Sequence, residues 1–283
     1  ERRIGIWPAG FDQDDILYSN TAYGDYPTYL PSQNKNHLNE NFSGWMLLNY
    51  NKPVQVSSTL GGYQPNLAVD EDIKTYWSAK TSNQGEYLIS DLGEVSTVNA
   101  IQINYADQDV ELMGKPENPI GHQYIIYSSN DGKNWKIAVD KSKNTQDVPH
   151  DYIELQKPIT ARFLKLENLK MPTGKFAISG FRVFGKGSGN KPNAVQNFVP
   201  LRSGPRVKGE RRNVWFKWQQ ETNADGYVIY FGKDPNKLYG AIMVYGKTEY
   251  YFNGLDRSDT YYFQIEAFNN NGIGPKSEVK KSE

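Results

Sequence analysis

The sequence predicts an all-β protein built from two successive β-sandwiches. Aromatic residues are abundant, with 20 Tyr, 12 Phe and 6 Trp, and such side chains favour pleated, half-buried surfaces. Short segments alternate apolar and polar residues between Gly, Asn and Asp turns, and no segment carries a sustained helical stripe. The length of 283 residues suits two domains of ordinary size.

The middle of the chain, residues 44–187, shows strand patterns throughout. In Val98–Tyr105 apolar and polar residues alternate, which is typical of a half-buried strand. Asn130-Asp131-Gly132 separates two apolar segments and predicts a tight hairpin turn, since Gly accepts a positive φ. The further strands expected here are Tyr124–Tyr127, Trp135–Val139, Phe163–Leu166 and Phe181–Phe184.

Residues 188–194 are rich in Gly, Ser, Asn and Pro and predict a linker, because these residues interrupt regular structure. The alternation resumes in residues 195–283, where several short strands at close spacing predict the second sandwich. The strands expected here lie in Val214–Trp218, Tyr227–Phe231 and Tyr261–Ala267.

Charge and composition exclude several classes of function. The 32 Lys and Arg residues balance 32 Asp and Glu residues, and a nucleic-acid partner is not expected without a basic stripe. Apolar runs such as Trp45–Leu48 are too short to insert into a membrane. The absence of cysteine removes disulfides and thiolate metal sites, and the three histidines lie far apart.

Residues 44–187 resemble the discoidin domain, also called the F5/8 type C or galactose-binding-like domain. The resemblance rests on five ordered motifs. These are Asn66–Asp70 with Thr75–Trp77, Gly85–Gly93, Ser129–Trp135, Ala161–Leu166 and Ala177–Gly185. It implies a jelly-roll β-sandwich of a kind that often serves as a carbohydrate-binding module.

Residues 195–283 resemble a fibronectin type III domain. Trp218 matches its core Trp, and Leu255 followed by Tyr261 matches its tyrosine corner, whose hydroxyl bonds back to the backbone. The resemblance also covers the last strands, through Ala267–Asn269 and Gly272–Ser277.

Residues 1–43 resemble the final part of the five-bladed propeller of family 43 glycoside hydrolases. Arg2–Phe11 carries the resemblance, with Leu17-Tyr18 and Gly24–Pro27. It implies a parent enzyme of xylosidase or arabinofuranosidase type whose catalytic carboxylates lie on earlier blades. The chain begins with Glu1 and is interpreted as the C-terminal fragment of that larger glycosidase.

Catalysis by this fragment is not expected. Glycoside hydrolysis needs two carboxyl groups flanking the scissile bond, and the propeller remnant offers Asp12, Asp14, Asp15 and Asp25. The cluster at 12–15 is also typical of a hairpin turn, because Asp bonds to its own backbone there. We favour the turn, and we predict that the fragment does not hydrolyse glycosides.

A structural calcium ion is the one cofactor that the sequence suggests. Carboxylates and a hydroxyl gather in residues 70–75, and Ca²⁺ takes six to eight oxygen ligands. The discoidin resemblance places its ligands at Asp70, at Asp72 through the carbonyl, and at Thr75. Glu71 and Gly180 depart from the family pattern, and a solvated acidic turn is the alternative.

Sugar binding is the favoured function. Sugar sites combine an aromatic platform with a few polar groups, and in discoidin-like modules they lie in loops at one end of the sandwich. The loops considered are 59–64, 80–84, 107–119 and 171–175. The candidate residues within and beside them are Tyr63, Gln64, Lys80, Asn83 and His122. Alternatively, Tyr63 covers the edge of the core and His122 caps the strand that starts at Gln123.

These observations predict a non-catalytic, carbohydrate-binding accessory region of a plant-polysaccharide-degrading enzyme. The expected partners are a polysaccharide or oligosaccharide and the missing catalytic propeller of the same polypeptide. A secreted, periplasmic or cell-surface bacterial location follows from that interpretation. The alternative is a structural scaffold that packs on the propeller and binds no sugar.

Overall fold

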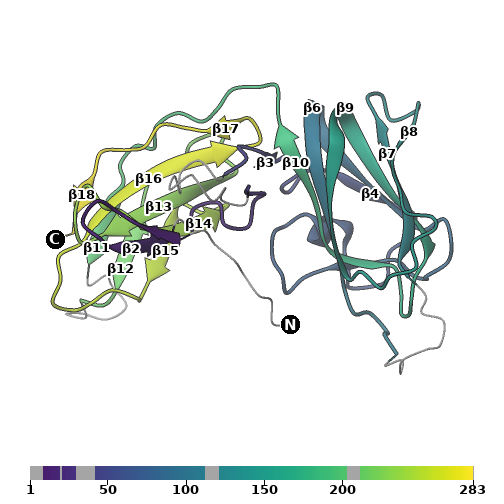
Figure 1. The fold of residues 1–283 in the computed structure, drawn as a ribbon, viewed down its shortest axis with the longest axis horizontal. Coiled ribbons are helices and arrows are strands. Elements are labelled where there is room, and N and C mark those ends of the chain that lie inside the picture. The colour runs from purple at the N-terminus through teal and green to yellow at the C-terminus, as the bar shows by residue number, and fades with distance from the viewer. Residues whose placement is uncertain (1–8, 20, 30–41, 112–120, 203–210, 283) are drawn as a thin grey trace. The chain divides into compact units, whose positions relative to one another are not determined.

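The computed structural model describes residues 9–19, 21–29, 42–111, 121–202 and 211–282. Parts of the predicted propeller remnant, residues 1–8 and 30–41, and most of the loop 107–119 lie outside them. The chain divides into two units. Unit 1 comprises Glu1–Met46 with Gly189–Glu283, and unit 2 comprises Leu47–Ser188. The predicted all-β class is confirmed: strands dominate both units (Figure 1).

Unit 2 is a single hydrogen-bonded sheet that folds over on itself. Its strand order is β3-β10-β6-β9-β7-β8, with β4 on β6 and β5 on β10. The strands are β3 (Met46–Leu47), β4 (Val54–Val56), β5 (Trp77–Ser78), β6 (Tyr87–Tyr105), β7 (Gln123–Ser129), β8 (Lys136–Asp140), β9 (His150–Lys170) and β10 (Ala177–Lys186). A 3-10 helix, η2, covers Pro65–Ala68.

Two long strands give unit 2 its shape. β6 and β9 pair along most of their length, with register shifts between Asp91 and Ser96 and between Val98 and Ala100. Such bulges bend a strand and increase its twist. As a result, side chains from both halves of β6 reach one core, which includes Leu88, Leu92 and Ile103.

The predicted Asp-Gly hairpin is confirmed between β7 and β8. Gly132 has φ +70°, a conformation in which a side chain would be strained. The Asp131 carboxylate accepts hydrogen bonds from the backbone N–H groups of Lys133 and Asn134, both at 2.8 Å. These bonds hold the pKa of Asp131 well below its ordinary value.

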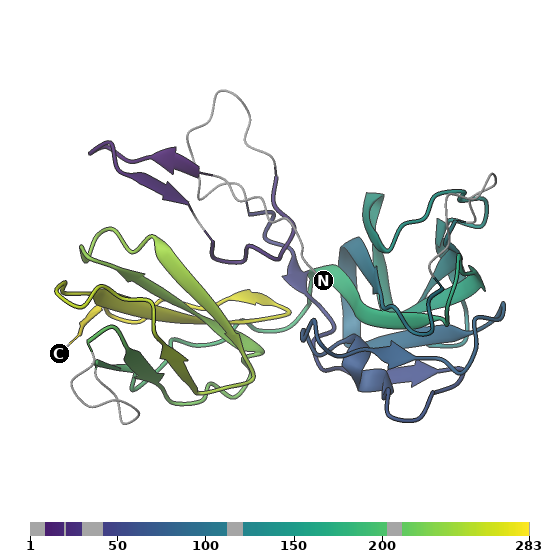
Figure 2. The ribbon, with the colours of Figure 1, turned by 90° about the horizontal axis from the view of Figure 1, so that it is seen from below.

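Unit 1 contains a three-stranded and a five-stranded sheet, which form separate layers in Figure 2. The first is β11-β12-β15, and the second is β14-β13-β16-β17 with β18 on β16. The strands are β11 (Val199–Arg202), β12 (Val214–Lys217), β13 (Gly226–Gly232), β14 (Gly240–Tyr245), β15 (Glu249–Phe252), β16 (Tyr262–Asn269), β17 (Gly272–Ile273) and β18 (Lys280–Lys281). Phe216 of one layer meets Phe263 of the other, with ring centroids 5.0 Å apart.

The tyrosine contact expected in this sandwich is present. The Tyr261 hydroxyl accepts a hydrogen bond of 3.0 Å from the backbone N–H of Asp256, next to buried Leu255. The assignment of the sandwich to the fibronectin type III family stays a prediction, as do the predicted domain boundaries.

The N-terminal segment belongs to unit 1 rather than standing alone. Its hairpin, β1 (Ala9–Phe11) with β2 (Leu17–Ser19), has its turn at Asp12–Asp15, as predicted. The Asp12 carboxylate accepts bonds of 2.9 Å from the N–H groups of Asp14 and Ile16. Lys237 binds the carboxylates of Asp12 and Asp14. These two candidate catalytic groups therefore serve a turn and an ion pair.

Candidate functional site

Loops at one end of unit 2 hold most of the predicted sugar-binding residues. The end loops comprise residues 57–64, 79–86, 106–111 and 171–175. Leu60 donates a backbone hydrogen bond of 2.8 Å to Ser78, and Phe176 donates one of 3.2 Å to Thr81. Lys175 donates one of 2.9 Å to Gln108. The four loops are therefore neighbours in one continuous surface.

A pair of tyrosines forms the aromatic feature of this surface. The rings of Tyr63 and Tyr76 stack with centroids 4.6 Å apart and an interplanar angle of 26°. Both side chains are half-buried. The Tyr76 hydroxyl donates a hydrogen bond of 2.8 Å to the side-chain oxygen of Gln108. Burial, followed by the hydroxyl of Tyr63, raises the pKa of Tyr76 to about 12, so this hydroxyl stays protonated at neutral pH.

Glu86 fixes the two loops that carry the other candidates. It is 8 % exposed and accepts hydrogen bonds from Ser58 at 2.9 Å and Thr81 at 2.7 Å, and one from Ser57. Burial by itself would raise the pKa of Glu86, but these hydroxyl donors outweigh it and lower the pKa. A buried carboxylate with three donors is a rigid anchor, so both loops are held in place without a ligand.

Lys80 and Asn83 lie on the anchored loop with exposed side chains. The backbone N–H of Lys80 donates to the Ser58 hydroxyl at 2.9 Å. The backbone carbonyl of Asn83 accepts a hydrogen bond of 3.0 Å from the Asn168 amide. Gln64 is exposed beside Tyr63. The backbones of Lys80 and Asn83 are thus fixed while the side chains of all three residues face solvent.

His122 lies apart from these residues, in the interior. It is 5 % exposed, and its ring lies against that of Tyr105 with centroids 4.2 Å apart. Its Nδ1 accepts a hydrogen bond of 3.1 Å from the backbone N–H of Val148. Burial lowers the pKa of His122 to about 4, against the opposing charges of nearby aspartates. His122 therefore supports a loop and does not face solvent with the other candidates.

The predicted calcium ligands do come together. The Thr75 hydroxyl lies 2.7 Å from Oδ2 of Asp70 and 3.0 Å from the backbone carbonyl of Asp72. The Glu71 carboxylate is turned away, because Arg182 binds it at 3.0 and 2.8 Å. Three convergent oxygens fit part of a calcium shell, which needs at least three more.

Other metal chemistry finds no support in the described ranges. No group of three or more His, Cys, Asp or Glu side chains gathers there closely enough to hold a metal ion. A cation at residues 70–75 would therefore depend on carbonyl, hydroxyl and water oxygens. No described helix has the length and apolar character needed to cross a membrane.

A family model matches the middle of the chain. The F5/8 type C domain model matches residues 53–180. The match supports a discoidin-like domain in unit 2, as the sequence resemblance implied. No curated protein matches the chain.

Solved structures similar to this chain include two bacterial modules. One is chitosan-binding module 1 of a chitosanase/glucanase from Paenibacillus sp. IK-5, at 24 % identity and a TM-score of 0.40; it covers 50 % of this chain and 99 % of its own. The other is a family 32 carbohydrate-binding module of C. perfringens NanJ in complex with galactose, at 19 % identity and a TM-score of 0.40. It covers 50 % of this chain and 98 % of its own.

Sequence reasoning missed several residues of this surface. Tyr76 forms half of the aromatic pair, and Gln108, Asp109 and Lys175 form a polar chain beside it. Gln108 donates to Asp109 at 2.7 Å, and Lys175 forms an ion pair with Asp109. The alternation of side chains along a strand could have indicated Tyr76. Trp77 matches a core position, so the side chain of Tyr76 next to it is expected to face away from the core.

Proposed function

We propose that the end loops of unit 2 bind a carbohydrate and that the chain is a non-catalytic accessory region. The stacked pair of Tyr63 and Tyr76 carries this proposal, together with the family match. An aromatic ring provides a flat apolar surface for the C–H face of a sugar. The side chains around it are polar, which suits hydroxyl recognition.

Each candidate residue has a distinct role in this proposal. The Tyr63 ring packs against the sugar, and Tyr76 holds that ring at a fixed angle. The exposed amide groups of Gln64 and Asn83 and the ammonium of Lys80 bond to sugar hydroxyls. Because Glu86 already orders the loops, binding loses little conformational entropy.

Affinity electrophoresis tests this function directly. The full chain is run through gels containing xylan, arabinan, arabinoxylan, galactan or chitosan, and retarded migration is expected in at least one. Tyr63→Ala should weaken that retention at least about tenfold, since a stacked ring contributes on the order of 1 kcal/mol beyond the contact area it buries. Tyr152→Ala removes a tyrosine that is 47 % exposed on β9 and should leave retention unchanged.

A scaffold without sugar binding is the second candidate, and one observation favours it. Tyr63 is half-buried on Tyr76, and Gln108, Asp109 and Lys175 already satisfy one another. In this second candidate function, these groups serve only to complete the surface of unit 2. Unretarded migration in every gel would support the scaffold and contradict sugar binding.

We further propose a calcium ion at residues 70–75, bound by Asp70, the carbonyl of Asp72 and Thr75. Thr75 precedes Tyr76 directly, so the ion would brace the aromatic pair through the backbone. Calcium should then raise the midpoint of thermal unfolding of unit 2, because a ligand that binds only the folded state stabilises it. Asp70→Asn should abolish the increase, and Asp107→Asn, an exposed carboxylate in another loop, should retain it.

The parent enzyme completes the proposal. We propose that the chain is the C-terminal part of an exported bacterial glycoside hydrolase of xylosidase or arabinofuranosidase type. The propeller-like motifs of residues 1–43 support this parent. The pure chain should therefore release no nitrophenol from nitrophenyl xyloside or arabinoside, and turnover would contradict the non-catalytic assignment.

A further inference from the structure

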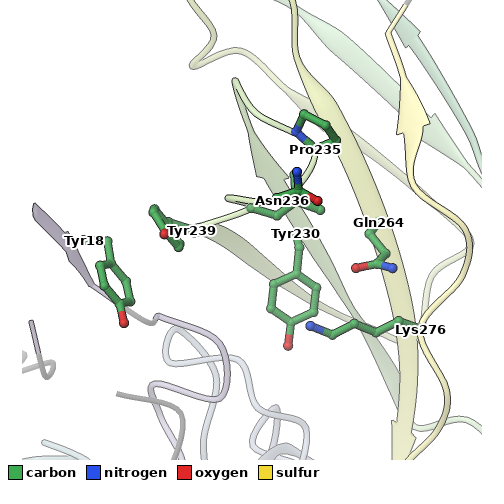
Figure 3. Close-up of a pocket in the computed structure, with 8 residues that line it drawn as sticks. Tyr18, Tyr230, Pro235, Asn236, Tyr239, Gln264 and Lys276 are labelled. Carbon is green, nitrogen blue, oxygen red and sulfur yellow. The ribbon is translucent and has the colours of Figure 1, made fainter. Parts of the chain in front are cut away.

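Unit 1 contains a cavity of about 380 Å³ that the proposed function does not use (Figure 3). This size lies within the range of roughly 300–1,000 Å³ that is usual for small-molecule sites. Four of the residues that line it are aromatic or cyclic: Tyr18, Tyr230, Pro235 and Tyr239. The remainder are Asn236, Leu238, Gln264 and Lys276.

The cavity is built from the N-terminal hairpin and from several segments of the sandwich that lie more than 200 residues later in the chain. Tyr18 comes from the N-terminal hairpin and stacks on Tyr239, with centroids 4.3 Å apart and an angle of 20°. The Tyr239 hydroxyl donates a hydrogen bond of 2.8 Å to Asp12 of the same hairpin. The aromatic wall therefore exists only while the hairpin is docked on the sandwich.

Lys276 is the only charged residue among the eight that line the cavity. Its ammonium lies 3.9 Å from the centre of the Tyr230 ring, which holds it by a cation–π contact. No carboxylate in the described part of the chain forms an ion pair with it. The ammonium thus keeps N–H donors for a ligand.

The carboxylate nearest to this end of the cavity is already engaged. Glu266 is 4 % exposed and accepts hydrogen bonds from the Tyr230 hydroxyl at 2.8 Å and the Tyr23 hydroxyl at 3.0 Å. The charge of Lys276 acts on Glu266 and opposes the burial that raises its pKa, but Glu266 is not among the lining residues. The lining itself therefore presents one positive charge, aromatic rings and two side-chain amides.

We propose that this cavity binds an acidic saccharide, with the sugar carboxylate on Lys276 and the sugar ring against the tyrosines. A simple anion would use the charge but leave the aromatic wall without a role. A neutral sugar would use the rings but form no ion pair with the ammonium. A uronic acid uses both features.

A neighbouring hollow extends the site. It has a volume of about 480 Å³ and shares Tyr18, Asn236 and Tyr239 with the first cavity. Its charged residues, Asp12, Asp14 and Lys237, pair with one another. The stacked rings therefore lie between a cationic hollow and one with a single excess negative charge. This suits an oligosaccharide whose acidic residue lies at Lys276 and whose residues beyond the rings are neutral.

Calorimetric titration of the full chain with galacturonate, a sugar with a single carboxylate, tests the site. Binding is expected, and Lys276→Gln should weaken it at least about tenfold, because a hydrogen bond to a charged group is lost. Lys276→Arg should retain most of the affinity, since a guanidinium also stacks on an aromatic ring. Lys280→Gln is the matched control, because it removes a lysine of the same unit that pairs with Glu278.

The same titration in the Tyr63→Ala variant separates this site from the end loops of unit 2. Galacturonate affinity should be unchanged there, whereas neutral galactose should show no binding that depends on Lys276. The proposal is overturned if the chain does not bind galacturonate, or if Lys276→Gln and Lys280→Gln weaken binding equally. Loss of galacturonate binding in Tyr63→Ala would also overturn it and would assign the acidic sugar to the end loops.

Discussion

Replacement of Tyr23 by Phe should loosen the N-terminal segment without removing a ring. Tyr23 is 3 % exposed, and its ring meets those of Phe42 and Phe268, with centroids 5.0 and 5.5 Å away. Its hydroxyl donates to the buried Glu266 carboxylate at 3.0 Å. Tyr23→Phe keeps the aromatic contacts and deletes only that donor.

The expected loss follows from the partner group. A hydrogen bond to a charged group contributes about 1.5–3 kcal/mol, and Glu266 keeps one donor from Tyr230 at 2.8 Å. For a unit of 141 residues, this loss lowers the unfolding midpoint by roughly 5–10 °C. Tyr23→Ala should lower it further, because truncation of a buried aromatic side chain costs about 3–5 kcal/mol.

Scanning calorimetry of the full chain measures the effect. Only the transition of unit 1 should move, so the transition of unit 2 serves as an internal reference. Tyr29→Phe is the matched control, because Tyr29 is 53 % exposed. If Tyr23→Phe shifts neither transition, or shifts both equally, the hydroxyl does not hold the segment on the sandwich and the reasoning fails.

Three further predictions concern buried charges. Burial raises the pKa of Glu266 above its ordinary value, so the stability that this group contributes is lost as the pH rises through the raised pKa. The unfolding midpoint of Glu266→Gln relative to that of wild type should therefore increase as the pH rises from about 4, and a difference that stays constant in calorimetry would contradict this. Burial lowers the pKa of His122 to about 4. The unfolded chain therefore takes up the proton first, and stability falls as the pH drops from about 6.5 to 4; the NMR ring signals of His122 should titrate near 4 rather than near 6.5. Arg182→Met leaves the Glu71 carboxylate, 12 % exposed, without its partner. It should lower the free energy of unfolding of unit 2 by about 3 kcal/mol, and an unchanged urea midpoint would show that the pair is not stabilising.

Local patterns predicted most of the strands. The alternation in Val98–Tyr105 indicated a strand, and the structure contains it within β6, which begins at Tyr87. Gly93, with φ +80°, is typical of a turn in sequence. In the structure Gly93 instead lies at a bulge, where the register between β6 and β9 shifts between Asp91 and Ser96, and the two strands pair on both sides of it. The alternation of apolar and polar residues therefore predicts each half of β6, but it does not predict that the two halves form one strand.

The candidate site was predictable at the level of loops but not of partners. Tyr63, Lys80 and Asn83 share the end loops, while His122 is buried beside Tyr105. A histidine at the start of a strand has the same sequence signal whether it faces solvent or the core. Burial depends on contacts with distant residues, which one sequence does not reveal.

The docking of the N-terminal segment is the feature furthest from sequence reasoning. Tyr23 and Glu266 are separated by 243 positions, and nothing local distinguishes Tyr23 from the other tyrosines. The cavity beside Lys276 depends on the same docking, because Tyr18 forms part of its wall. Residues that look like the end of one domain thus complete the surface of another.

Chain connectivity explains how such docking can be stable. Unit 2 is inserted between the two parts of unit 1, at Leu47 and Ser188. Its entering strand β3 is the neighbour of its leaving strand β10, and Leu48 donates a hydrogen bond of 2.8 Å to Val183. Folding of unit 2 therefore brings the two ends of the insertion together. An unfolded insertion of this length would oppose docking by about 4 kcal/mol of loop-closure entropy, which exceeds the contribution of the Tyr23 hydrogen bond. The N-terminal segment consequently depends on the fold of unit 2 as well as on its own contacts with the sandwich.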